Sequence, residues 1–209
     1  MAEGDLHVHV FFSEDSFEQL QQLSDCTATS KANIIRLLLY WFRYLVPTEQ
    51  ELQSFQQQIV KVKTLQIRLH ASLMSLVSVP HAISNTVYVS FALYTALQQT
   101  KHAFHLSKNC TNSYRTSALL QEDLFYGLAS VTRETGIQKS AFISVAILTL
   151  LPIEQLVLEH MEKKQIGFRL SSYSKDYLYT LEQQSEYNVN TIINQKVRSF
   201  LQEVTDFIV

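Results

Sequence analysis

Histidines are the residues in this 209-residue chain whose type and spacing first suggest chemistry. His7 and His9 alternate with apolar residues, so both imidazoles lie on one face of an expected strand. Together with His70, which ends another expected strand, they could hold a metal ion. No acidic or thiol ligand joins them, so a solvent-exposed strand face is the favoured alternative. We therefore expect no metal and no other cofactor.

Catalytic motifs are absent from the sequence. It contains no glycine-rich phosphate loop, no nucleophile elbow and no HExxH zinc motif. The acidic stretches "EDSFE" and "EDLFY" are typical of helix starts, where carboxylates face free amide groups. We predict that the protein is not an enzyme.

The spacing of the apolar residues changes after the histidines, and this change indicates a strand followed by a helix. Leu6–Phe12 alternates as a strand does, whereas Phe17, Leu20 and Leu23 share one helical face. Ser13 suits the start of that helix. "DCTAT" then predicts a turn, and Ser30 or Thr29 is expected to cap a second helix.

The same strand, helix, turn, helix pattern recurs along the chain. "FSEDSFEQLQQL" (Phe12–Leu23) aligns with "LQEDLFYGLASV" (Leu120–Val131), and a further copy begins at Ile166. A weaker copy begins at Leu65 and needs a shortened first helix. Gly136 is expected to form the turn between the helices of the third unit.

The four units predict two halves. Residues 1–107 hold units at about 5–46 and 64–100, and residues 108–209 hold units at about 113–151 and 165–204. Pro47–Lys63 and Pro152–Gln165 each begin with proline and predict extra linking helices. A polar seam at His105–Ser113 separates the halves.

Composition limits the class of protein. Four glycines and three prolines indicate a mainly α protein with short strands, and 46% hydrophobic residues indicate a globular, soluble one. The formal charge of −2 excludes a globally basic chain. Cys26 and Cys110 lie far apart without a CxxC motif, so the sequence suggests neither a zinc site nor a disulfide framework. A reduced, cytoplasmic setting is the default expectation. No signal peptide or membrane span is expected.

A single amphipathic strand cannot satisfy its own backbone groups, so the strands must pair. With "LHVHVFFSED" as strand and first-helix start and "SKANIIRLLLYWF" (Ser30–Phe42) as second helix, the chain resembles the ribbon-helix-helix family of DNA-binding proteins, of the Arc, MetJ and CopG type. The resemblance implies tandem ribbon-helix-helix units that pair as pseudo-dimers, one with two and three with four.

The resemblance also implies that outward strand residues read DNA bases in the major groove and that the start of each second helix holds a phosphate. The DNA-binding positions carried over in this way are His7, His9, Gln66, Arg68, Arg115, Ser117, Gln165 and Arg169 on the strands, and Ser30, Lys139 and Asn190 at the helices. Arg115 and Arg169 should line one exposed face. Phe11 and Leu119 depart from the pattern, which suggests that some ribbons are covered.

Double-stranded DNA is accordingly the expected partner, and a transcriptional repressor or regulator is the expected function. The alternative is a protein-binding oligomerisation adaptor, or a DNA-transfer accessory factor of a mobile element, in which some units no longer contact DNA. The aromatic residues Tyr40, Trp41, Phe42 and Tyr44 predict either a core between the halves or a homodimer interface.

Overall fold

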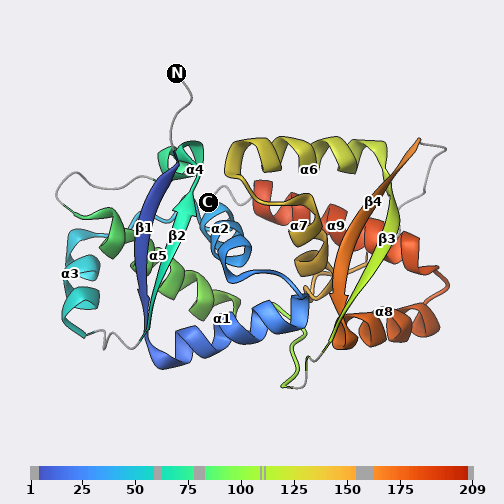
Figure 1. The fold of residues 1–209 in the computed structure, drawn as a ribbon, viewed down its shortest axis with the longest axis horizontal. Helices are drawn as coiled ribbons and strands as arrows, with labels where there is room; N and C mark the ends of the chain where they lie inside the picture. Colours follow the sequence, from blue (N-terminus) through green and yellow to red (C-terminus); the bar gives the residue numbers. More distant parts are fainter. Residues whose placement is uncertain are drawn as a thin grey trace.

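The computed structural model describes residues 5–58, 63–77, 83–108, 110, 112–153 and 162–206. These residues are mainly helical and include two small antiparallel sheets of two strands each (Figure 1). The elements of the first half are β1 (Leu6–Phe12), α1 (Glu14–Thr27), α2 (Lys31–Trp41), α3 (Glu49–Gln58), β2 (Lys63–Leu69), α4 (Ala71–Leu76) and α5 (Asn85–Thr100). Those of the second half are β3 (Ser113–Gln121), α6 (Glu122–Thr135), α7 (Lys139–Ile147), β4 (Lys163–Ser171), α8 (Ser172–Gln184) and α9 (Val189–Asp206).

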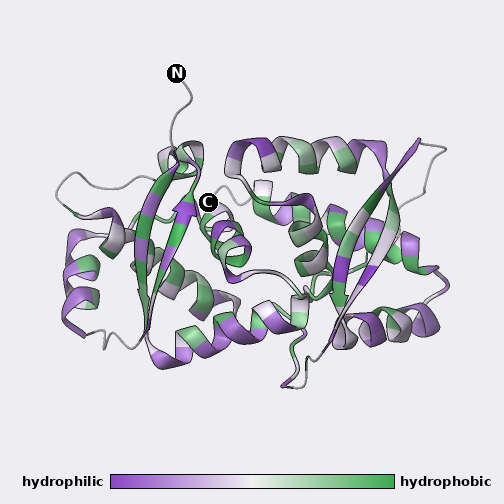
Figure 2. Ribbon diagram, in the orientation of Figure 1, coloured by the Kyte–Doolittle hydropathy of each residue, from purple (hydrophilic) through white to green (hydrophobic). Residues whose placement is uncertain are grey.

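The strands pair within each half, as their alternating patterns predict. In ribbon 1, formed by β1 and β2, His9 lies opposite Gln66. In ribbon 2, formed by β3 and β4, Arg115 lies opposite Arg169. Figure 2 shows hydrophilic and hydrophobic residues alternating along these strands. The apolar face of each ribbon is buried against helices, which leaves the polar face as the outer one.

Local capping follows the sequence closely. The Ser13 and Ser30 hydroxyls accept hydrogen bonds from the Ser16 and Asn33 amides, so these serines begin α1 and α2. Gly136 ends α6 with a φ of 71°, a left-handed conformation that favours glycine. Of the two expected linking helices, the first is α3. Most of the second falls at 154–161, outside the described residues.

The second unit is the least regular of the four. Its first helix, α4, has only 6 residues, in keeping with the shortened helix expected from the alignment. It begins after His70, whose side chain makes no capping hydrogen bond. Pro80, expected near the end of this helix, lies outside the described residues.

The second helix of every unit hydrogen-bonds the strand of its partner unit. Arg36 of α2 donates to the Arg68 carbonyl at 2.7 Å, and Ser144 of α7 donates to the Arg169 carbonyl at 2.7 Å. The reciprocal bonds run from the Phe11 amide to Ser90 of α5 at 3.1 Å, and from Asn194 of α9 to the Leu119 carbonyl at 2.8 Å. Arg36, Ser90, Ser144 and Asn194 each follow a buried aliphatic residue at the same place in their units. In each half, therefore, the second helix of one unit is hydrogen-bonded to the strand of the other unit.

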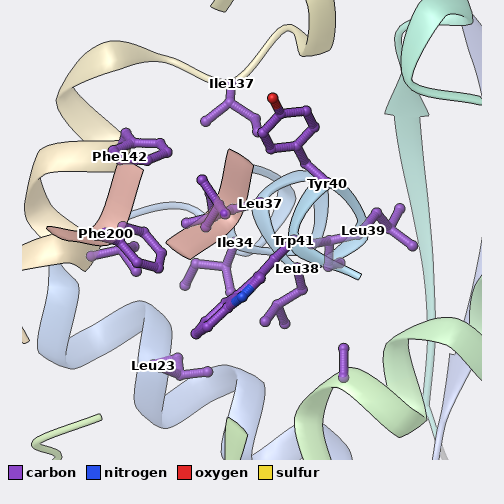
Figure 3. Packing of buried hydrophobic residues seen from close by; sticks show 14 of the residues in the cluster. Leu23, Ile34, Leu37, Leu38, Leu39, Tyr40, Trp41, Ile137, Phe142 and Phe200 are labelled. Carbon is purple, nitrogen blue, oxygen red and sulfur yellow. The ribbon is translucent and has the colours of Figure 1, made fainter. Parts of the chain in front are cut away.

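The two halves share one hydrophobic core, with α2 at its centre. Trp41 packs edge-on against Phe104. It also packs edge-on against Phe200 of α9, which in turn contacts Phe142 of α7 (Figure 3). Tyr40, Trp41 and Phe42 are buried within this single chain, whereas Tyr44 is exposed. The aromatic set thus forms core between the halves, and three of its four residues are not available to a homodimer.

A disulfide joins Cys26 at the end of α1 to Cys110 before β3. The expectation of two separate, reduced cysteines is therefore wrong. Their 84-residue separation carried no sign of proximity, because only the packing of α1 against the second half brings them together. The Cys26 carbonyl also accepts a 2.6 Å hydrogen bond from the Ser171 hydroxyl, so backbone and disulfide connect the halves at one place. A cytoplasmic setting remains a prediction.

Among the described residues, no helix has both the length and the apolar character needed to cross a membrane.

Candidate functional site

The outer face of ribbon 2 carries four of the predicted site residues, Arg115, Ser117, Gln165 and Arg169, all with hydrogen-bonding side chains. Arg115 and Arg169 lie directly opposite each other, and both are exposed. Arg169 donates to the Ser113 hydroxyl at 3.3 Å, and Gln165 donates to the Ser117 hydroxyl at 3.2 Å. Arg115 has no hydrogen bond or ion pair among the described residues. The arginines therefore line one exposed face, as expected if β3 and β4 pair.

This arrangement is not one that ribbon stability alone would favour. Like charges directly opposite each other on a ribbon repel, which destabilises the pair. On the same face, Gly167 lies between Arg169 and Gln165 along β4, opposite Ser117 of β3. A Cβ atom at Gly167 would lie 3.8 Å from the Thr116 carbonyl oxygen, an ordinary van der Waals contact, so a small side chain would fit there. The outer face therefore carries two opposed cations, of which Arg115 has no hydrogen-bond partner among the described residues.

Acidic residues lie toward the other end of ribbon 2. Lys164 contacts Glu122 and Glu162 at 3.5 Å each, and the Glu122 carboxylate raises the pKa of the Lys164 ammonium. Arg198 of α9 pairs with Asp123 at 2.7 Å. Of the cations on the strands of ribbon 2, Arg115, Arg169 and Lys163 form no ion pair among the described residues, and the two arginines lie directly opposite each other.

Ribbon 1 presents a different outer face. His7, His9, Gln66 and Arg68 are all exposed on it. Arg68, however, forms a 2.5 Å ion pair with Asp5, which offsets its charge. Within the described part of the chain, no group of three or more histidine, cysteine, aspartate or glutamate side chains is placed to hold a metal ion.

One end of that same face is covered. Phe11 is buried, and its ring stacks on Phe55 of α3 with centroids 5.8 Å apart. Phe55 also packs edge-on against Phe91 of α5. The linking helix α3 therefore explains the apolar residue on an expected polar face. Leu119, the second such residue, remains 43% exposed on ribbon 2.

The three predicted phosphate-binding residues have different surroundings. Ser30 begins α2 beside a hollow that faces ribbon 2 rather than ribbon 1. Lys139 begins α7, and its ammonium lies 3.9 Å from the centroid of the Phe125 ring of α6. The Asn190 side chain accepts a hydrogen bond from the Leu119 amide at 3.1 Å, so it also contacts the ribbon backbone.

Several residues that shape the site were not singled out from the sequence. Ser144 and Asn194 hold α7 and α9 against ribbon 2, and Arg36 holds α2 against ribbon 1. The available signal was their equivalent place in the repeated units. Burial lowers the pKa of Arg36, with Asp5 acting in the opposite direction.

No family model, curated protein or solved structure matches the chain.

Proposed function

We propose that the chain is a sequence-specific DNA-binding protein, a transcriptional repressor or regulator, that uses ribbon 2 as its principal contact with the major groove. The observation that carries the proposal is the exposed cross-strand pair Arg115 and Arg169, flanked by Ser117 and Gln165. Arginine donates two hydrogen bonds to guanine, and glutamine pairs with adenine in the same way. A two-stranded ribbon fits the width of the major groove.

The reciprocal helix–strand hydrogen bonds support tandem ribbon-helix-helix pairing. Each strand is held by the second helix of the other unit in its pair, so the two units of a half depend on each other. This interlocking is the arrangement that the family resemblance implies. It presents the ribbon on a rigid support, which recognition of base edges requires.

Ribbon 1 is proposed to contribute little or nothing to DNA contact. Phe11 is covered by α3 and Arg68 is paired with Asp5, so this face offers less free positive charge than ribbon 2. The adaptor alternative retains one specific support in Leu119, an exposed apolar side chain on the outer face of ribbon 2. In an adaptor, that side chain would contact a protein rather than a thymine methyl group.

The test is selection of duplexes from a random pool at two salt concentrations, followed by affinity measurements on the enriched sequence. Arg115→Ala/Arg169→Ala should weaken binding by about 100-fold, because each arginine–guanine contact contributes roughly 1–3 kcal/mol. The matched control His9→Ala/Arg68→Ala, on ribbon 1, should change it by less than about threefold, which corresponds to under about 0.7 kcal/mol. Failure to enrich any duplex, or equal losses in both double variants, would contradict the proposal.

A further inference from the structure

A cleft of about 700 Å³ lies between α3 and α5, in the first half of the chain. Glu51 and Phe55 line it from α3, Phe91 and Tyr94 line it from α5, and Asp15 borders it at the start of α1. The residues of each pair are three or four places apart, so each pair shares one helix face. The volume is within the range of pockets that hold small-molecule ligands.

The cleft exists because α3 contacts the rest of the chain along a narrow stripe. Within α3, all of which the structure describes, only Leu52 and Phe55 are buried. The Phe55 ring stacks on Phe11 of ribbon 1 and also reaches the wall of the cleft. Figure 1 shows α3 on the side of ribbon 1 that faces away from ribbon 2. The cleft is therefore separate from the proposed DNA-contacting face.

Aromatic rings from both helices form the apolar part of the lining. Phe55 packs edge-on against Phe91 with centroids 5.4 Å apart, and at a tilt against Tyr94 with centroids 5.5 Å apart. Phe55 is buried, whereas Tyr94 remains 38% exposed, so part of the Tyr94 side chain is not used to pack the chain. The face of an aromatic ring carries partial negative charge and attracts a cation placed over it.

The described charged residues of the lining are both acidic. Asp15 and Glu51 border the cleft, and no lysine or arginine does so among the described residues. Neither carboxylate forms an ion pair within the described part of the chain. Hydrogen bonds from the Thr48 amide and hydroxyl, each of 2.8 Å, lower the pKa of the Glu51 carboxyl, which therefore stays negative at neutral pH. The charge and the rings favour the same kind of ligand.

We infer that this cleft binds a small organic cation, a quaternary or protonated amine carried on an apolar body. The cationic nitrogen would be attracted by the two carboxylates and by the ring faces, while the apolar body contacts the aromatic wall. The side-chain amides of Gln50, Gln58 and Gln98 offer donors and acceptors to a polar substituent. Because ribbon 2 contributes no residue to the described lining, the inference is independent of the proposed DNA contact.

The experiment compares two probes that differ in one atom. Para-hydroxyphenyltrimethylammonium carries a quaternary nitrogen where para-tert-butylphenol carries a neutral carbon. Each probe is titrated into the full chain at neutral pH, and the amide resonances of Phe91 and Tyr94 report occupancy. The cation should bind saturably and at least about tenfold more tightly than the neutral probe. Equal affinities, or no saturable binding of the cation, would overturn the inference.

The contribution of the carboxylates is tested with Asp15→Asn/Glu51→Gln. Glutamine can accept the Thr48 hydrogen bonds in place of glutamate, so the start of α3 is retained. This variant should bind the cation at least about fivefold more weakly, because two opposite charges are lost, and should bind the neutral probe as the parent does.

The matched control is Glu14→Gln/Glu49→Gln, which removes two exposed carboxylates from the same helix starts but outside the lining. It should change the affinity for the cation by less than about twofold, because salt screens charges that lie farther from the ligand. Equal losses in the two double variants would overturn the cleft as the binding site.

The contribution of the exposed ring is tested separately at Tyr94. Tyr94→Leu keeps an apolar side chain but removes the ring face, and it should weaken binding of the cation by at least about threefold. Tyr94→Phe keeps the ring and should bind the cation as the parent does. If Tyr94→Phe loses as much affinity as Tyr94→Leu, the ring face does not hold the cation and the inference is overturned.

Discussion

Ribbon 1 and ribbon 2 are built alike, yet their outer faces differ. Each is an antiparallel pair of strands held by the second helices of two units. On ribbon 1, α3 covers Phe11, and Asp5 pairs with Arg68. On ribbon 2, two arginines face each other in the open. The difference teaches that a repeated unit can preserve its pairing while a linking helix and one carboxylate change what its surface can bind.

Helix α2 belongs to the first half but also contacts the second half, so the two halves do not play equal parts. Its C-terminal turn lies in the shared core, where Arg43 donates hydrogen bonds to the Val204 carbonyl of α9 and to the Tyr40 carbonyl of α2. Its N-terminal turn borders the hollow at ribbon 2. The first half thus supports the second at both ends of one helix.

The largest expected effect on stability concerns the disulfide that connects the two halves. Replacing both cysteines, Cys26→Ser/Cys110→Ser, should lower the free energy of unfolding by about 4 kcal/mol, because the disulfide restricts a long loop of the unfolded chain. Urea unfolding of oxidised parent and variant measures the difference. A reducing agent should destabilise the parent and leave the double variant unchanged. Equal midpoints for the oxidised parent and the variant would show that no such constraint acts.

Removing the ring that covers Phe11 on ribbon 1 is expected to give the second largest loss in the free energy of unfolding. Phe55→Ala removes a buried ring that contacts Phe11, Phe91 and Tyr94, and should destabilise the chain by about 3 kcal/mol. The control Phe125→Ala, on the partly exposed helix start beside ribbon 2, should cost less because less burial is lost. Thermal unfolding compares the two. If Phe55→Ala costs no more than Phe125→Ala, α3 does not stabilise ribbon 1.

A pH dependence should distinguish the fourth unit from the other three. Lys196 occupies the place of Leu38, Ala92 and Ala146, and burial lowers its pKa to about 8. Between that value and the ordinary lysine pKa, the unfolded chain holds the proton and the folded chain does not. The free energy of unfolding should therefore rise by about 2 kcal/mol between about pH 8 and pH 10.

Lys196→Met removes the titrating group and should remove this rise. Denaturant unfolding at several pH values provides the measurement, with Lys175→Met, an exposed lysine on α8, as the control that retains the rise. Parallel curves for the parent and Lys196→Met would show that the ammonium keeps an ordinary pKa. In the folded chain it donates to the Thr149 and Leu151 carbonyls at 2.8 Å each.

The smallest expected effect concerns a buried amide in the second helix of the fourth unit. Gln195 lies where the other units have Leu37, Phe91 and Val145, and neither polar atom of its buried amide has a hydrogen-bond partner among the described residues. Gln195→Leu should raise the free energy of unfolding by about 1 kcal/mol, because an unsatisfied buried amide is removed. Calorimetry provides the measurement, and a lower unfolding temperature would indicate an unseen partner for the amide.

Local structure could be predicted closely from the sequence. The strand at Leu6–Phe12, the caps at Ser13 and Ser30, and the left-handed turn at Gly136 all occur where periodicity and residue type place them. Strand pairing within each half was also predictable, because each amphipathic strand needs one partner. The site face on ribbon 2 followed from the same alternation, since every second residue of a strand shares a face.

Other features depended on contacts between distant residues. The Cys26–Cys110 disulfide, the covering of Phe11 by Phe55 and the joining of two helix starts at the hollow have no local pattern. The sequence by itself determined the repeated strand–helix–helix units and the polar side of each ribbon, because hydrogen bonding and amphipathicity act between near neighbours. Only the tertiary structure decided which ribbon stays open, because that depends on how the halves and α3 pack across the chain.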